Sequence, residues 1–314
     1  MKSEAIYDTI INERLKRILK IQSTVIGATT EYLRQKGFVQ LLPVMLSPIT
    51  DPLGPDPGSS VIKTGTIEYL GQKLQLTQSM ILHKQIAIAK GLDKIFILSP
   101  NIRLESPSKK ETGVHAFEFT QLDFEIAHAK MSDIFSLVEE MLRFVKSKVL
   151  SAHLKELEFL ERNPFLWNYP FPRYTSHFLE EYYGKKWEEK VSKEAETPFW
   201  VICHDREFYD KKEWSRKDGN HFLNYDLYYP EGYGEALSGG EREYEYHLLI
   251  RRIEEDQIPH EKLFSYLELA KKGLLRPSAG AGIGIERLVR YFTGAKHIKE
   301  VQLFKRIPGE KVVF

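Results

Sequence analysis

Two segments in the middle of the chain, residues 94–105 and 117–126, alternate between apolar and chemically active side chains. If both are strands, every second residue shares one face. One face then presents Ser99, Asn101, Arg103 and Glu105 from the first strand, and Phe117, Phe119, Gln121, Asp123 and Glu125 from the second. Unpaired buried charges are costly, so this face needs a ligand or counter-charges. An antiparallel hairpin with a solvated face is the alternative.

A basic loop joins these two segments, and a glycine-rich segment near the C-terminus could accompany it. The loop carries Lys109, Lys110 and His115, which suit a polyphosphate. Residues 280–284 alternate glycine with small or apolar residues, which lets a strand pass close to a nucleotide, and Arg287 follows at a predicted helix start. No βαβ unit surrounds these glycines, so they do not predict a dinucleotide fold.

A third polar group occupies residues 224–242. We predict a strand at Asn224–Tyr229 that carries Asp226, then a turn at Gly232 and Gly234. Glu235 and Ser238 follow this turn, and two carboxylates together with phosphate oxygens are ordinary magnesium ligands. Taken alone, the glycines and charges at 239–242 would be interpreted as the turn that starts a helix.

The remaining periodic segments would position these groups. Apolar residues recur at helical spacing in 8–36 and 131–161, and Gly37 is placed to end the first helix. Ser79 can cap a helix that stops at Gly91. The other predicted elements are a strand at 38–42, a hairpin turning at Gly71, a helical piece at 173–196 and a buried strand at 198–204.

Composition limits the class of protein. A chain of 314 residues with 42% hydrophobic residues can bury a large core. The net charge of +1 is not that of a general nucleic-acid binder. One cysteine, Cys203, excludes an internal disulfide and a cysteine cluster, and it is interpreted as a small buried hydrophobe. No window reaches the roughly 18 apolar residues that a membrane span requires, so we expect a cytoplasmic protein.

Three segments together resemble the motifs of the class II aminoacyl-tRNA synthetases, in the aspartyl/asparaginyl subgroup. The order along the chain is also the family's order. The helix, strand and proline that end at Pro43 resemble motif 1. Arg103-x-Glu105 with residues 115–125 resembles motif 2, and residues 280–287 resemble motif 3. Glu235-x-x-Ser-Gly-Gly-x-Arg242 resembles a further motif of the subgroup. The resemblance implies an α+β fold in which helices flank an antiparallel sheet of six or seven strands.

The resemblance also implies roles for individual residues. It implies that Arg103 is catalytic and bridges the substrate carboxylate and the α-phosphate of ATP. The implied ATP-binding residues are Arg103, Glu105, His115, Phe119, Glu235 and Arg287; the implied ligands of Mg²⁺ are Asp226, Glu235 and Ser238; and the implied amino-acid-binding residues are Ser79, Lys84, Asp123 and Arg242. Phe119 would stack on adenine, Glu105 would accept from its amino group, and Asp123 would take the substrate ammonium.

Two positions bear on the substrate. Aspartyl enzymes have a lysine that meets the substrate's side-chain carboxylate, and Lys84 is similarly placed, which favours aspartate; a solvated helix lysine is the alternative. Ile81 stands where the family has a glutamine that holds the substrate ammonium, and Val114 stands where it commonly has an arginine. A reversed aspartate, activated at its β-carboxylate, would explain the loss of that glutamine.

The pattern most resembles the archaeal asparagine synthetase paralogues, which are related to asparaginyl-tRNA synthetase. This predicts an aspartate–ammonia ligase that forms AMP, with L-aspartate, ATP and ammonia as substrates and Mg²⁺ as cofactor. We expect one catalytic domain over residues 1–314, a helical insertion at about 150–200, no anticodon-binding domain, a homodimer through motif 1, and no tRNA partner. The alternatives are a truncated synthetase that charges tRNA or another acceptor, and a non-catalytic regulator that binds amino acid or tRNA.

Overall fold

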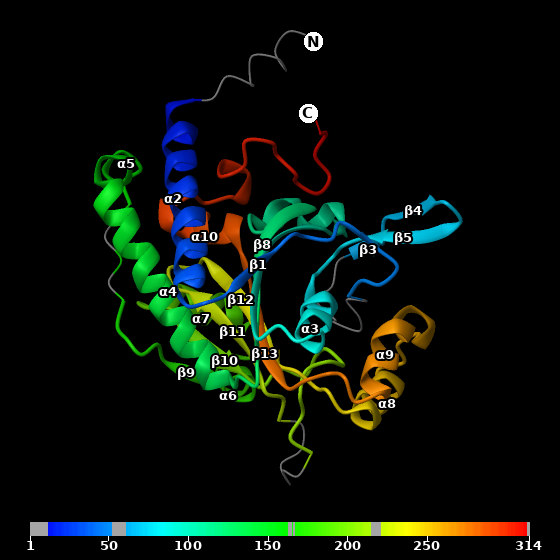
Figure 1. Ribbon diagram of the computed structural model, residues 1–314. Coiled ribbons are helices and arrows are strands. Elements are labelled where there is room, and N and C mark those ends of the chain that lie inside the picture. The colour runs from blue at the N-terminus through cyan, green and yellow to red at the C-terminus, as the bar shows by residue number, and fades with distance from the viewer. Residues whose placement is uncertain (1–11, 52–60, 163–164, 166, 215–220, 313–314) are drawn as a thin grey trace.

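A long mixed sheet forms the centre of the protein. The computed structural model describes residues 12–51, 61–162, 165, 167–214 and 221–312. Within these residues, one sheet has eight strands in the order β1-β6-β8-β13-β12-β11-β10-β9 (Figure 1). Their bounds are β1 Val39–Leu41, β6 Lys94–Ile102, β8 Glu118–Ala127, β13 Ser278–Gly284, β12 Gly234–Glu241, β11 Asn224–Tyr229, β10 Phe199–Ile202 and β9 Arg173–Thr175.

The strand pairing confirms a largely antiparallel α+β architecture and corrects the strand number. The six inner strands, from β6 to β10, pair antiparallel. The two edge strands, β1 and β9, each have three residues and pair parallel. The sheet therefore exceeds the expected six or seven strands. The strand predicted at 38–42 is the edge strand β1, whereas the three residues of β9 leave no alternating pattern in the sequence.

Smaller strands surround the main sheet. β2 (Leu46–Ser47), β5 (Gln72–Leu76) and β4 (Thr66–Tyr69) form one small sheet, and β3 (Val61–Lys63) pairs with β7 (Leu104–Glu105). The predicted hairpin at Gly71 is confirmed, since this glycine has a left-handed φ of 74° between β4 and β5.

Helices pack against the apolar face of the sheet. α2 (Glu13–Gln35), α4 (Met131–Ala152) and α10 (Ile285–Thr293) pack there, and α5 (Leu154–Phe159) continues beyond α4 (Figure 1). Phe96, Leu122 and Phe124 are fully buried in this core, as the alternation predicts. The chemically active residues of β6 and β8 consequently face the opposite side of the sheet.

The other helices form two satellite clusters. α3 (Ile81–Ala89), α8 (Tyr246–Glu255) and α9 (Phe264–Lys271) share a second apolar core. α6 (Ser176–Tyr183) and α7 (Trp187–Glu194) pack on β10 and β11 in a third. In the part of the chain that the structure describes, short 3₁₀ turns lie at η1 Pro107–Thr112, η2 His260–Leu263 and η3 Ile298–Glu300. The segment interpreted as a helical insertion also supplies β9, so it extends the main sheet.

Helix ends follow the sequence signals with small shifts. Asn12 caps α2 by accepting from the Leu15 amide at 2.8 Å, and Gly37 follows that helix with φ at 82°. α3 begins at Ile81, and its N-cap residue, Met80, makes no side-chain capping bond. Ser79, the predicted cap, lies one residue earlier, and its hydroxyl accepts from the Ile81 amide at 3.3 Å. None of the helices in the described ranges is long and apolar enough to cross a membrane.

Candidate active site

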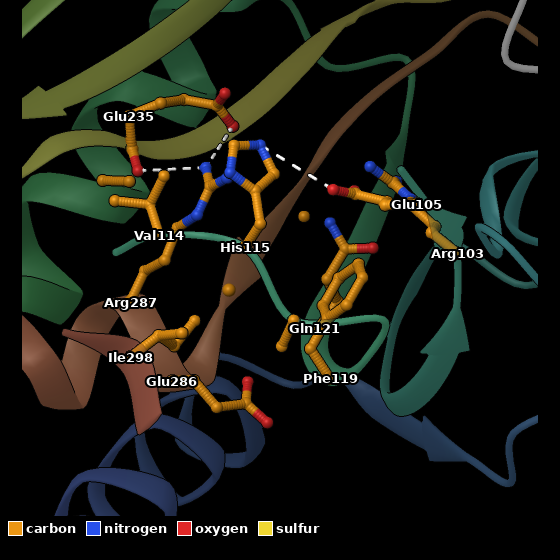
Figure 2. A pocket seen from close by; sticks show the side chains of 14 residues that line it. Arg103, Glu105, Val114, His115, Phe119, Gln121, Glu235, Glu286, Arg287 and Ile298 are labelled. Carbon is orange, nitrogen blue, oxygen red and sulfur yellow. Dashed lines mark hydrogen bonds and ion pairs between the residues drawn. The ribbon is translucent and has the colours of Figure 1, made fainter. Parts of the chain in front are cut away.

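A pocket opens on the polar face of the sheet, where β8, β12 and β13 meet the start of α10 and the loop after β7 (Figure 2). Six of its lining residues are those that the resemblance assigned to ATP. The lining residues are Arg103, Glu105, Val114, His115, Ala116, Phe119, Gln121, Glu235, Ala236, Gly282, Gly284, Glu286, Arg287 and Ile298. The fold therefore brings the predicted ATP residues together from four separate stretches of the chain.

Arg103 and Phe119 form one side of the pocket. The Arg103 Nε donates to the Gln78 carbonyl at 3.1 Å, which fixes the guanidinium. Its Cζ lies 5.2 Å from the centroid of the Phe119 ring, a cation–π distance. A cationic group beside an aromatic face suits a ligand that combines a planar base with phosphate.

His115 lies across from Glu105. The His115 Nε2 is 4.0 Å from the Glu105 Oε2, and its Nδ1 is 2.6 Å from the Thr112 hydroxyl. Burial, with Arg287, Lys109 and Arg103 nearby, lowers the pKa of His115 to about 4. The imidazole is therefore neutral near pH 7.

Arg287 and Glu235 form the opposite side of the pocket (Figure 2). The Arg287 Nη1 is 3.2 Å from the Glu235 Oε1 and also donates to the Glu235 carbonyl at 3.2 Å. Both side chains remain partly exposed toward the pocket, with Arg287 at 24% and Glu235 at 41%. An incoming anion can therefore reach Arg287 without unfolding its surroundings.

Glu286 is a pocket residue to which the sequence assigned no role. Its two carboxylate oxygens accept from the Thr120 amide at 3.0 and 3.1 Å. Burial raises the pKa of Glu286 to about 7. The motif 3 pattern identified the position, but a pattern of residue types could not reveal that α10 buries this carboxylate against β8.

Behind the pocket lies a buried ionic network. Lys84, which is 2% exposed, has its Nζ 2.9 Å from the Asp123 Oδ1 and 3.9 Å from the Glu125 Oε2. The same ammonium donates to the Ala281 carbonyl at 3.1 Å. Lys84 is therefore no solvated helix lysine, because its head group is held between α3, β8 and β13.

Arg242 joins the network from the other side. Its Nε lies 3.2 Å from the Glu125 Oε1, its Nη1 lies 3.2 Å from the Asp210 Oδ1, and its Nη2 donates to the Gly280 carbonyl at 3.0 Å. Asp210 is 2% exposed and was not predicted from the sequence. It lies in an irregular segment that reaches Arg242 through an isolated bridge, so no periodic signal marks it.

Gly282 connects the network to the pocket. A Cβ at this glycine would lie 2.8 Å from the Gln121 Nε2 and 3.0 Å from the Asp123 Oδ1. Both Gly282 and Gln121 line the pocket, so Asp123 lies directly behind its wall. The buried Asp123 Oδ2 has no hydrogen-bond partner within the described residues, which leaves it able to accept from a ligand's ammonium.

Ser79 and Ile81 lie at the start of α3, away from the pocket lining. Ser79 is 9% exposed and follows Gln78, whose carbonyl positions Arg103. Ile81 is 5% exposed and packs in the core shared by α3, α8 and α9. Ser79 thus lies one residue from a group that orients the predicted catalytic arginine.

Of the three predicted magnesium ligands, Glu235 lines the pocket and the other two do not. Asp226 and Ser238 pair with each other across β11 and β12. The Arg206 Nη1 donates to both Asp226 oxygens at 2.8 and 2.9 Å, and His204 Nε2 lies 3.3 Å from the Asp226 Oδ2. Glu235 fits a magnesium ion shared with phosphates. Asp226 can bind magnesium only if Arg206 releases its carboxylate. No signal in the sequence identified Arg206.

Comparison with known proteins identifies relatives along nearly the whole chain. An asparagine–tRNA ligase of Thermococcus kodakarensis is 31% identical over 94% of this chain and 70% of its own length. An aspartate–tRNA(Asp/Asn) ligase of Methanopyrus kandleri is 31% identical over 94% of this chain and 68% of its own. The crystal structure of asparaginyl-tRNA synthetase from Pyrococcus horikoshii with asparaginyl-adenylate superposes with a TM-score of 0.83 at 28% identity, covering 95% of this chain and 70% of that one.

These relatives correct one expectation and support another. The expectation that tRNA is no partner is contradicted, because the relatives that match this chain are tRNA ligases. The net charge was a poor guide, since it averages over the whole surface and ignores local patches. ATP use is supported by the adenylate-bound relative. Residues 2–308 match the model for tRNA synthetases class II (D, K and N), so the chain belongs to that family, whose members are ATP-using ligases.

Proposed function

We propose that the protein activates an amino acid of the aspartate/asparagine pair with ATP and transfers the acyl group to a tRNA. The observation that carries this proposal is the position of the Lys84–Asp123 pair directly behind the wall of the Arg103–Phe119 pocket. A site for a small zwitterion thus adjoins a site for a nucleotide. The names of the relatives support tRNA as the acceptor.

The first step would join the amino acid to AMP. A carboxylate oxygen attacks the α-phosphorus of ATP, the bond to the β-phosphate oxygen breaks, and pyrophosphate leaves. Arg103 would neutralise the two anions that must approach each other, since Gln78 already holds its guanidinium in place. Phe119 would hold the adenine by stacking, with Glu105 accepting from its amino group.

The leaving pyrophosphate requires positive charge on the other side of the pocket. Arg287 is partly exposed there, and its partner Glu235 can exchange it for phosphate oxygens. Neutral His115 keeps one N–H available for a phosphate oxygen. Bound magnesium would supply Lewis-acid stabilisation of the phosphates, with Glu235 as its protein ligand.

The buried network supports aspartate as the activated amino acid. Lys84 and Arg242 can pair with a substrate carboxylate, and Asp123 can accept from its ammonium. An asparagine amide offers no charge to a buried lysine. We therefore expect the network to favour aspartate over asparagine.

A second candidate is the synthesis of free asparagine, and the same lysine favours it. An aspartate site in a chain whose relatives are asparagine–tRNA ligases suits an enzyme that turns aspartate into asparagine. Ammonia would attack the acyl carbon of a β-aspartyl-adenylate, AMP would leave, and the new amide nitrogen would lose a proton. This candidate differs from tRNA charging only in the acceptor and in the carboxylate that is activated.

Product analysis separates the two candidates. The protein would be incubated with ATP, magnesium and labelled aspartate, with or without total archaeal tRNA and with or without ammonium. Label on tRNA establishes the charging enzyme. Free labelled asparagine and AMP without tRNA would establish the second candidate, and absence of AMP under every condition would contradict both.

A further inference from the structure

Three metal-ligating side chains that do not line the nucleotide pocket meet near the ends of β10 and β11. His177 belongs to α6, Cys203 directly follows β10, and His221 precedes β11. One ligand atom from each lies within 4.8 Å of the others. The Cys203 Sγ is 3.0 Å from the His221 Nδ1, and the rings of His177 and His221 are 5.6 Å apart and nearly perpendicular.

The donor set is that of a zinc site. Thiolate and imidazole are the ligands that zinc favours, at about 2.3 Å for sulfur and about 2.0 Å for nitrogen. Tetrahedral geometry at these bond lengths separates the donor atoms by roughly 3.5 Å. The observed limit of 4.8 Å therefore requires adjustments of only about 1 Å, which side-chain rotation can supply. Magnesium prefers oxygen ligands and does not suit this set.

The three residues differ in exposure, and the most exposed one gives a metal ion access from solvent. Cys203 is 5% exposed, His221 is half-buried, and His177 is exposed. An ion can thus bind His177 from solvent, and the buried Cys203 thiolate and His221 can then join its coordination. A fourth tetrahedral position toward solvent would take water.

We propose that His177, Cys203 and His221 bind a zinc-class divalent cation. The ion replaces the thiol proton of Cys203, which is released on binding. It links α6 to the ends of β10 and β11, where the Ser176 hydroxyl already donates to the Cys203 carbonyl and the Cys203 amide donates to the Asn224 carbonyl. This site does not depend on the proposed aminoacylation, because none of its residues lines the nucleotide pocket.

Metal titration of the full chain tests the proposal directly. Protein freed of metal by chelation is titrated with Zn²⁺ against a chromophoric chelator, in excess Mg²⁺. We expect one Zn²⁺ per chain and no competition from Mg²⁺. With Co²⁺ in place of Zn²⁺, we expect a thiolate-to-cobalt charge-transfer band, which Cys203→Ser abolishes.

Variants of exposed histidines test zinc binding without changing a buried side chain on which folding depends. His177→Ala changes an exposed side chain and should weaken zinc binding by more than about tenfold. His247→Ala is the matched control, since that histidine is 73% exposed on α8. Substoichiometric binding, equal affinity in the His177 and His247 variants, or a cobalt spectrum without the thiolate band would overturn the proposal.

Discussion

The Lys84 Nζ lies 2.9 Å from the Asp123 Oδ1, in a pair whose side chains are 2% and 3% exposed. A buried ion pair is rarely the most stabilising choice of residues, and its retention is informative when it adjoins a pocket. The pair places a cation beside a carboxylate behind the wall of the pocket. The proposed function assigns this arrangement to the binding of an amino acid with an acidic side chain.

Removing Lys84 alone should destabilise the protein strongly. Lys84→Met leaves Asp123 buried without its counter-charge, which typically costs about 3–5 kcal/mol of unfolding free energy. Urea denaturation measures the loss, and Lys193→Met, at a residue 62% exposed, is the control. The double variant Lys84→Met with Asp123→Asn should recover most of the stability, since neither remaining group is charged. A single variant within about 1 kcal/mol of the parent would contradict the role of this pair.

Truncating Phe119 should weaken ATP binding. Stacking of a base on an aromatic ring contributes about 1–3 kcal/mol, so Phe119→Ala should raise the KM for ATP by roughly tenfold or more. Phe119→Tyr retains the ring and should remain near the parent value. ATP–pyrophosphate exchange at varied ATP provides the measurement. Equal KM values for the alanine and tyrosine variants would show that adenine binds elsewhere.

Glu286 should give stability a specific pH dependence. Its pKa rises from 4.5 to about 7 on folding, so the folded protein binds this proton more tightly than the unfolded chain does. The contribution of Glu286 to stability is therefore present below about pH 4.5 and is lost as the pH rises through about 7. The parent should lose stability relative to Glu286→Gln by at most about 1.4 kcal/mol per pH unit in this window.

Urea denaturation at several pH values compares the two proteins, and the difference cancels the other titrating groups. Glu189→Gln is an informative control, because the hydrogen bond from Lys193 lowers the pKa of Glu189 from 4.5, so its contribution is lost only at more acidic pH and this variant should follow the parent between pH 5 and pH 8. If the parent and Glu286→Gln retain a constant difference from pH 5 to pH 8, Glu286 does not titrate in this range.

Adding a methyl group at Gly282 should impair amino-acid activation. The new Cβ would lie 2.8 Å from the Gln121 Nε2 and 3.0 Å from the Asp123 Oδ1, so both side chains must move. Gly284→Ala is the matched control on the same strand, because its Cβ would meet only side-chain carbons of Arg287, at 3.5 to 3.6 Å, which are ordinary contacts. We expect a raised KM for the amino acid in Gly282→Ala alone. Parent-like kinetics in both variants would show that Asp123 does not bind the substrate amino acid.

Local patterns in the sequence predicted the sheet face that carries the site. The alternation of side chains can be seen within each strand on its own. In the folded protein Ser99 pairs with Gln121 and Asn101 with Phe119, so the predicted polar residues share one face. The edge strand β1 lies within the strand predicted at 38–42. The other edge strand, β9, escaped prediction because its three residues show no period and precede a helical pattern.

Long-range partners escaped prediction for a different reason. Asp210 and Arg206 lie in an irregular segment after β10, and only the folded chain brings them to Arg242 and Asp226. The motifs named six residues that line the pocket. They could not name the side chains that pair with the predicted site residues, such as Asp210 with Arg242 and Arg206 with Asp226.

The most direct measurement is amino-acid-dependent ATP–pyrophosphate exchange with aspartate and with asparagine, each in the parent and in Arg103→Ala. The account predicts exchange with aspartate, much weaker exchange with asparagine, and a loss of about 10²–10³ in rate when Arg103 is removed. Exchange with asparagine in preference to aspartate would contradict the role of Lys84. Exchange with neither amino acid would contradict activation itself.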